Sequence, residues 1–151
     1  METVKTETRP GQVDLRLWVR LLDCAKVIEK RLRRNFQEQF DTTLPRFDVM
    51  AALDRVTDGL NMGALSKALL VSNGNVTAIV RQLHEQGLVV SQPDPEDRRS
   101  AIVALTPAGK TQFAALAAAH HQWVREALQD FPADRQDQLL SLLTELKSHL
   151  R

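Results

Sequence analysis

The segment from residue 72 to residue 86 has an outward face that is unusual for a helix in water. Counted at 100° per residue, its apolar side chains fall on one side: Val76, Ile79, Val80 and Leu83. The remaining positions near its start are small or form hydrogen bonds, with a single charge: Ser72, Asn73, Gly74, Asn75, Thr77, Ala78, Arg81 and Gln82. Such side chains permit close approach to a base edge, where amides and arginine form paired hydrogen bonds in the major groove of DNA. An ordinary solvated helix with a serine cap also fits this pattern.

A second candidate group is the charged run Pro93-Asp94-Pro95-Glu96-Asp97-Arg98-Arg99. Short apolar runs rich in valine and isoleucine flank it at residues 88–92 and 100–105, which predicts a two-stranded hairpin with a charged tip. An arginine at such a tip can enter the minor groove beside a helix in the major groove. We expect Asp97 to orient the neighbouring guanidinium through a charge-assisted hydrogen bond. A charged tip that serves only solubility is the alternative.

Length and composition limit the class of protein. The chain has 151 residues, enough for one compact domain. Lys and Arg total 20 against 19 for Asp and Glu, so a net charge of +1 makes no general demand for a polyanionic partner. The single cysteine, Cys24, excludes an intrachain disulfide and predicts a reducing cytoplasm. No apolar run is long enough to span a membrane, and we expect residues 1–10 to be a disordered tail rather than a secretion signal.

The elements that would position these side chains are mostly helices. Apolar residues at three- or four-residue spacing predict a long helix over residues 13–40. Capping residues and Pro45 predict a helix over residues 46–55, and Asn61 predicts the start of a short one over residues 62–70. Ser72 then caps a longer helix that ends at Gly87, and two helices so close together indicate a helix-turn-helix.

Two more helices follow the predicted hairpin. Thr106 and Pro107 open one that runs to about residue 130, and Pro132 opens another that runs to residue 150. The last carries an apolar seam at Leu139, Leu142, Leu143, Leu146 and Leu150. The expected fold class is mainly α with a small β-hairpin.

Four stretches of this sequence, residues 61–66, 71–77, 83–89 and 97–109, together resemble the MarR family of bacterial winged-helix transcription regulators. The last stretch has the family's wing pattern, with Asp97 and Arg99 followed by Leu105-Thr106 and by Gly109 three residues later. The resemblance implies a single MarR-type domain over residues 1–151. Residues 13–40 and 106–150 would be its dimerisation helices, and residues 44–105 its winged helix-turn-helix lobe.

The resemblance also implies a homodimer that binds double-stranded DNA. The apolar seams of the first and last helices support this, because so small a chain has no other large surface to cover them. Two lobes would read half-sites about one helical turn apart, hence an imperfect palindromic operator. Carried over by position, the expected contacts with bases and phosphates come from Ser72, Asn73, Asn75, Thr77 and Arg81, with Arg99 in the minor groove, held by Asp97, and Arg98 on a phosphate.

Members of the family are often repressors that a small aromatic acid or its thioester releases from DNA. The candidate walls of such a ligand site are Trp18, Phe36, Phe47, Met50 and Phe113, with Arg46 as an anion anchor. Core packing is the commoner role for each of these aromatic residues. The basic run Lys30-Arg31-Leu32-Arg33-Arg34 is either a solvated helix face or a site for DNA or for the phosphates of a coenzyme A thioester.

Three alternatives stay open from the sequence. Cys24 raises a thiol-based oxidation sensor, although the chain has no tyrosine to stabilise a thiolate as that branch of the family does. A winged-helix module that binds proteins would use the same helix on another surface. A metal sensor needs more ligands than the four histidines supply, since none lie four residues apart. Because no phosphate-binding glycine loop or nucleophile motif is present, we expect neither an enzyme nor a cofactor.

Overall fold

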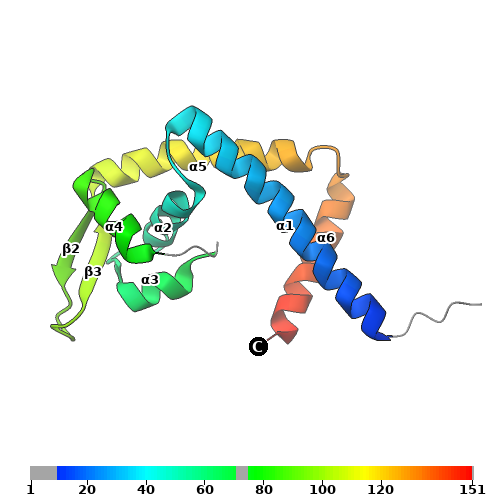
Figure 1. Ribbon diagram of the computed structural model, residues 1–151, viewed down its shortest axis with the longest axis horizontal. Coiled ribbons are helices and arrows are strands. Elements are labelled where there is room, and N and C mark those ends of the chain that lie inside the picture. Colours follow the sequence, from blue (N-terminus) through cyan, green and yellow to red (C-terminus); the bar gives the residue numbers. More distant parts are fainter. Residues whose placement is uncertain (1–9, 71–74, 151) are drawn as a thin grey trace, which may run out of the picture.

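The computed structural model describes residues 10–70 and 75–150 and shows two regions joined by a long helix (Figure 1). One region is formed by most of α1 (Pro10–Phe40) and by α6 (Ala133–His149). The other gathers α2 (Leu44–Asp54), α3 (Met62–Ala68), α4 (Val76–Glu85) and a small sheet. The connecting helix is α5 (Pro107–Leu128), drawn in yellow and orange. The predicted fold class is confirmed, and the predicted tail lies largely outside the described residues.

The sheet has three antiparallel strands in the order β1-β3-β2. β2 (Val89–Pro93) and β3 (Ala101–Leu105) form the predicted hairpin, with Val90 opposite Ala104. β1 (Leu60–Asn61) was not predicted, because two residues carry no periodic pattern and their pairing with β3 is long-range. Gly59 makes this pairing possible: its φ is +83°, and a Cβ there would lie 2.4 Å from the carbonyl oxygen of Val103.

Side-chain caps set where most helices begin. The side chains of Thr43, Asn61 and Thr106 accept backbone N–H groups at the starts of α2, α3 and α5, at 3.3, 2.8 and 3.0 Å. The predicted start of α4 was wrong. Its cap is Asn75, whose Oδ1 accepts the N–H of Ala78 at 3.1 Å, so the helix begins at Val76. It ends as predicted, at Gly87 with a φ of +74°.

The core surrounds α2, which contacts α1, α3, α4, α5 and β3. Its buried side chains meet buried residues of every one of those elements, including Phe36, Leu65, Leu83, Val103 and Leu116. One buried residue of α2 is polar: Asp48 accepts the backbone N–H of Leu70 at 2.8 Å, just beyond the end of α3. The helix α2 is therefore the platform on which the helix-turn-helix rests.

The far ends of α1 and α6 contrast with this core. Large apolar side chains are exposed along both helices: Val13, Leu15, Leu17, Trp18, Val19, Leu22 and Val27 on α1, and Leu139, Leu140, Leu142 and Leu143 on α6. No residue of α6 is buried. Across residues 10–70 and 75–150, no helix has the length and apolar character needed to cross a membrane.

Candidate nucleic-acid interface

The outward face of α4 is polar and nearly uncharged in its first half, as the sequence predicts. Val80 and Leu83 are buried against the core, whereas Thr77 and Arg81 are exposed on the other side. Asn75 is exposed too, but its carboxamide oxygen caps the helix, which leaves its NH₂ group to donate to a partner. Two of the predicted contact residues, Ser72 and Asn73, lie outside the described residues. In the first half of α4 the available groups are thus hydrogen-bond donors and acceptors around one guanidinium, and the exposed carboxylate of Glu85 follows one turn after Arg81.

A second side chain of the predicted outward set, Gln82, contacts another helix of the protein. The carboxamide oxygen of Gln82 accepts a hydrogen bond from Arg46 Nη1 at 3.4 Å, and that of Gln86 accepts one from Arg46 Nη2. Arg46 lies in the first turn of α2. Its Nε is buried and has no hydrogen-bond partner among the described residues. Burial lowers the pKa of Arg46, an effect that the charge of Asp41 opposes. Gln82 therefore contacts α2 through its oxygen.

The tip of the hairpin is built by two aspartates. Asp94 Oδ1 accepts the N–H of Glu96 at 2.9 Å, and Asp97 Oδ1 accepts the N–H of Arg99 at 3.0 Å. The carbonyl oxygen of Asp97 also accepts the N–H of Ser100 at 3.0 Å. Such side-chain-to-backbone bonds two residues apart are typical of Asx turns. The tip is thus built from two Asx turns.

The contact expected of Asp97 differs from the one observed. Its carboxylate holds the backbone of Arg99, whereas we expected it to hold the guanidinium. The physical reason is distance along the chain: an aspartate side chain reaches the N–H two residues on more readily than the end of a long arginine. Arg98 and Arg99 are both exposed on this turn. Their guanidinium groups are therefore presented to solvent.

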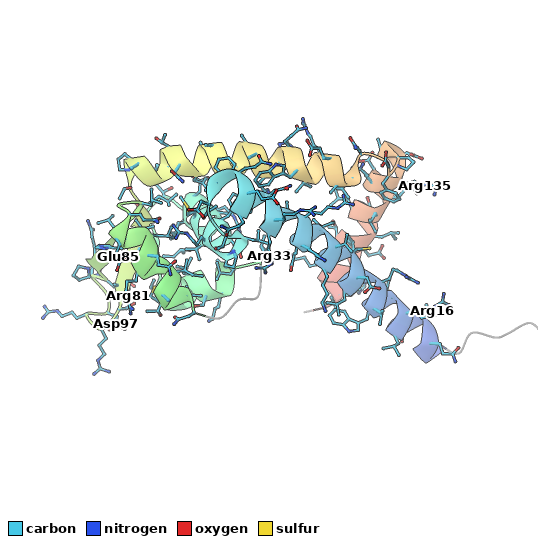
Figure 2. The ribbon with its side chains drawn as sticks, turned by 45° about the horizontal axis from the view of Figure 1, so that its top comes forward. Arg16, Arg33, Arg81, Glu85, Asp97 and Arg135 are labelled. Carbon is cyan, nitrogen blue, oxygen red and sulfur yellow. The ribbon has the colours of Figure 1, made fainter. Side chains whose placement is uncertain are left out.

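The helix and the hairpin tip lie at the same end of the molecule. Figure 2 shows Arg81 on α4 and Asp97 on the hairpin close together in that view, at the end away from Arg16 and Arg135. Such a helix has small polar residues and lies beside a hairpin that carries two free arginines. Together they can contact a groove of double-helical DNA and the adjoining phosphates. This is the arrangement of a winged helix-turn-helix.

Comparison with known proteins gives the same result. The family model described as "MarR family" matches residues 40–100. The transcriptional activatory protein BadR of Rhodopseudomonas palustris is 30% identical over 139 residues, which cover 90% of this chain and 79% of that protein. The chain belongs to the MarR family. It is a transcription regulator that binds DNA, and its family is not one of enzymes.

Solved structures of MarR-family regulators share the whole architecture. The crystal structure of a MarR family transcriptional regulator from Silicibacter pomeroyi has a TM-score of 0.82 and 32% identity, over 96% of this chain and all of that one. Sco3205 of Streptomyces coelicolor, in complex with DNA, has a TM-score of 0.77 and 20% identity, over 99% of this chain and 94% of that one. The second likeness shows the fold alone. For this MarR-family chain, the comparisons favour DNA reading over the alternative of a protein-binding module.

Of the candidate ligand residues of this MarR-family chain, Trp18 lies apart from the others. Phe36, Phe47 and Met50 are buried core residues, and the Phe47 ring stacks on the half-buried Phe113 at 5.5 Å. Trp18 is 58% exposed. It precedes Phe36 by about five turns of α1, or about 27 Å, so Trp18 does not line a wall with the others. Arg46, the expected anion anchor, is held by the two glutamines of α4.

Phe36, Phe47 and Phe113 belong to an aromatic cluster, and sequence reasoning missed two of its members, Trp123 and His120. Trp123 lies 4.8 Å from Phe36 between ring centroids. His120 of α5 stacks on Phe47 with ring centroids 4.6 Å apart, and on Phe36 at 6.1 Å. Burial, with a smaller effect of His121, lowers the pKa of His120. The position of His120 on the inward face of α5, one turn after Leu116, is the signal that could have identified it.

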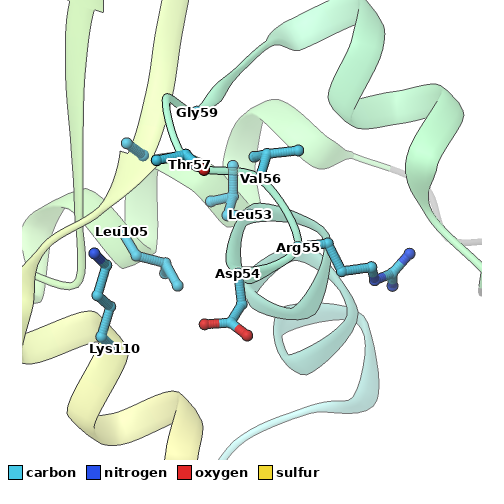
Figure 3. A pocket seen from close by; sticks show the side chains of 9 residues that line it. Leu53, Asp54, Arg55, Val56, Thr57, Gly59, Leu105 and Lys110 are labelled. Carbon is cyan, nitrogen blue, oxygen red and sulfur yellow. The ribbon is translucent and has the colours of Figure 1, made fainter.

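A separate cavity of about 330 Å³ lies between the end of α2, the base of the sheet and the start of α5 (Figure 3). Its apolar lining comes from residues such as Leu53 and Leu105, and its polar lining from Asp54 and Lys110. Figure 3 shows the Arg55 side chain pointing away from Lys110. None of the candidate ligand residues lines this cavity.

The remaining candidates of the MarR-family chain lie on α1. Within the basic run, Arg33 approaches Glu29 at 4.0 Å, and both side chains are more than a third exposed, so this pair is a solvated ion pair. Lys30, Arg31 and Arg34 are exposed. Cys24 is exposed as well, as a free thiol. Over the described residues, no three His, Cys, Asp or Glu side chains gather as a metal site requires.

Proposed function

We propose that this MarR-family protein acts as a homodimer that reads an imperfect palindrome. In each protomer α4 would lie in the major groove, with Asn75, Thr77 and Arg81 near bases and phosphates, and Ser72 and Asn73 just before them. Arg99 would enter the minor groove, and Arg98 would contact a phosphate. The single observation that carries this proposal is the shared location of the exposed polar face of α4 and the exposed arginines of the hairpin tip.

Selection from a random duplex pool with the purified protein tests this reading. Recovered sequences should contain two inverted half-sites with centres about one helical turn apart, because a two-fold dimer presents two identical lobes. Recovery of a single asymmetric site, or of no common sequence, would contradict the proposal. Such DNA binding, together with a reduced thiol, suits the bacterial cytoplasm as the place where the protein acts.

Dimerisation through α1 and α6 rests on their exposed apolar faces. On α6, Leu139 and Leu142 lie on the same face and are 44% and 63% exposed, and on α1 Leu15 is 63% exposed. Contiguous apolar faces of this kind mark interaction surfaces, and a second copy supplies the same faces in return. Leu139→Glu combined with Leu142→Glu should yield monomers in sedimentation experiments. The control Val56→Glu, at an exposed site on the other lobe, should stay dimeric; a dimeric double variant would contradict the assignment.

We infer repression as the sign of regulation, because occupation of a promoter excludes RNA polymerase without any further contact. The relative BadR is named as an activatory protein, so the sign needs a direct test. A reporter downstream of the selected operator should be silenced by the protein. Increased expression would show activation instead.

A small aromatic acid or its coenzyme A thioester is the proposed effector that releases the DNA. The support is the position of the cluster of Phe36, Phe47, Phe113 and His120, where α1, α2 and α5 meet. A ligand inserted between these helices would move the DNA-reading lobe relative to α1. Such a ligand would enter beside Phe113 and Arg46, the half-buried members of the expected wall. Calorimetry with matched free acids and thioesters tests this. Absence of binding heat with the thioesters would exclude thioesters as effectors, and absence with both would exclude aromatic acids as well.

A further inference from the structure

Arg46 connects α2 to α4 by a polar contact that spans one turn. Its two terminal nitrogens donate to Gln82 and Gln86, which are four residues apart and therefore lie one above the other on the same face of α4. We call this pair of contacts the Arg46 bridge. An arginine fork suits two acceptors held side by side in this way.

Among the described residues, the other side-chain contacts between α4 and the core are apolar. It comes from the buried Val80 and Leu83, with Val76 and Ile79 partly buried beside them. This apolar stripe sets which face of α4 points inward. Hydrophobic burial has no direction, however, so it restrains small rotations about the helix axis only weakly. Hydrogen bonds do have direction. The Arg46 bridge thus supplies an angular restraint that the apolar contact lacks.

Rotation of α4 matters because it would move Arg81, the proposed base-contacting residue. Arg81 directly precedes Gln82, about 100° away around the helix axis. An axial rotation that moved Gln82 would therefore swing the Arg81 guanidinium by a similar angle. Paired contacts with a base edge tolerate little displacement.

We propose that Arg46 is a positioning residue that sets the rotation of α4 and so determines which bases the protein distinguishes. Arg46 itself need not touch DNA. The inference rests on the proposed reading of DNA by α4 and adds a residue on another helix to it.

The variant Arg46→Met keeps most of the side-chain stem and removes the bridge. It should lower affinity for the selected operator by about tenfold, the factor that corresponds to about 1.4 kcal/mol of lost hydrogen bonding. Affinity for a random duplex should change much less. The melting temperature should stay level or rise, because the variant also removes a buried Nε that has no partner among the described residues.

The matched control is Arg55→Met, which removes the same charge from the other end of α2, where Arg55 is exposed. Its effect measures the general electrostatic loss on DNA binding. The pair Gln82→Leu with Gln86→Leu removes the bridge from the α4 side, so it covers the case in which Arg46→Met does not fold. Added to Arg46→Met, this pair should lower operator preference no further.

Operator affinity of Arg46→Met equal to that of Arg55→Met would overturn the inference. A melting temperature of Arg46→Met that falls in parallel with its operator affinity would overturn the inference as well, because it would show that Arg46 only stabilises the fold. Failure of the proposed function gives a different result: Arg81→Ala would then also bind the operator like the unchanged protein. Loss with Arg81→Ala but not with Arg46→Met refutes the bridge alone.

Discussion

The imidazole ring of His120 stacks on the phenyl ring of Phe47, with centroids 4.6 Å apart and an angle of 28° between the rings. The two residues belong to α5 and α2, and Phe36 of α1 completes the contact. A titratable side chain therefore lies where the helices of the exposed apolar region meet the platform of the DNA-reading lobe. Its protonation state must affect how firmly these helices hold together.

Stability should fall in mild acid because of His120. Burial, and to a smaller degree His121, lowers its pKa below the ordinary 6.5, so below that pH the unfolded chain binds more protons than the folded one. The stability that neutral His120 contributes is complete above pH 6.5 and is lost as the pH falls toward the lowered pKa. Melting temperatures from pH 7.5 to 5 should drop less in His120→Phe than in the unchanged protein. The control His149→Gln should keep the full drop; equal drops in all three would contradict the assignment.

Arg81 and Arg98 should differ in what they contribute to DNA binding. Arg81→Ala should cost about 1–3 kcal/mol on the selected operator and relax sequence preference, because it removes a base contact. Arg98→Ala should weaken binding to all sequences alike and lower the salt slope by about one, because it removes a phosphate contact. Gel-shift titrations at two salt concentrations, with selected and random duplexes, separate the two effects. The same loss on both duplexes for Arg81→Ala would show that it reads no base.

Asp97 should act through its oxygen and not through its charge. Asp97→Asn keeps an oxygen that accepts the N–H of Arg99, so the turn and operator preference should survive. Overall affinity should rise, because a negative charge beside DNA is removed. Asp97→Ala loses the acceptor and should lower operator preference several-fold, on the order of 1 kcal/mol. If Asp97→Asn lowers operator preference as much as Asp97→Ala in the same titrations, the carboxylate of Asp97 acts through its charge, by holding a guanidinium.

Gly109 should be intolerant of any side chain. A Cβ at this position would lie 2.0 Å from the carbonyl oxygen of Leu88, so α5 would have to move away from the start of β2. Gly109→Ala should cost about 2 kcal/mol or more in the free energy of unfolding, measured with urea. Gly63→Ala, within α3, is the matched control, because a Cβ there would lie at an ordinary 3.5 Å from its nearest neighbour, Asn61 Oδ1. That variant should be neutral or more stable by up to about 1 kcal/mol.

Local signals explain why much of the fold was predictable. Thr43, Asn61 and Thr106 cap helices as their types suggest, because a cap acts within three residues of chain. The hairpin and the end of α4 at Gly87 follow from equally local patterns. The start of α4 was misplaced because Ser72 and Asn75 are both good caps, and sequence alone does not choose between them.

Contacts between distant residues were not predictable in the same way. The pairing of β1 with β3 and the bridge from Arg46 to Gln82 and Gln86 join segments about 40 residues apart. Arg46 was expected to bind an anionic ligand, because the sequence around a single arginine does not show which residues it will contact in the fold. The same applies to Phe36 and Phe47, whose spacing fits a ligand wall as well as the core that they form.

The continuity of α5 has a mechanical consequence. Its 22 residues, Pro107 to Leu128, form a single stiff rod about 33 Å long, anchored at one end beneath the hairpin by the bond from Thr106 Oγ1 to the carbonyl oxygen of Gly87. A tilt of about 5° at the far end moves the anchored end by about 3 Å, which approaches the rise of one base pair. In the proposed dimer, a contact made at the α6 end would therefore adjust the distance between the two hairpin tips along the DNA.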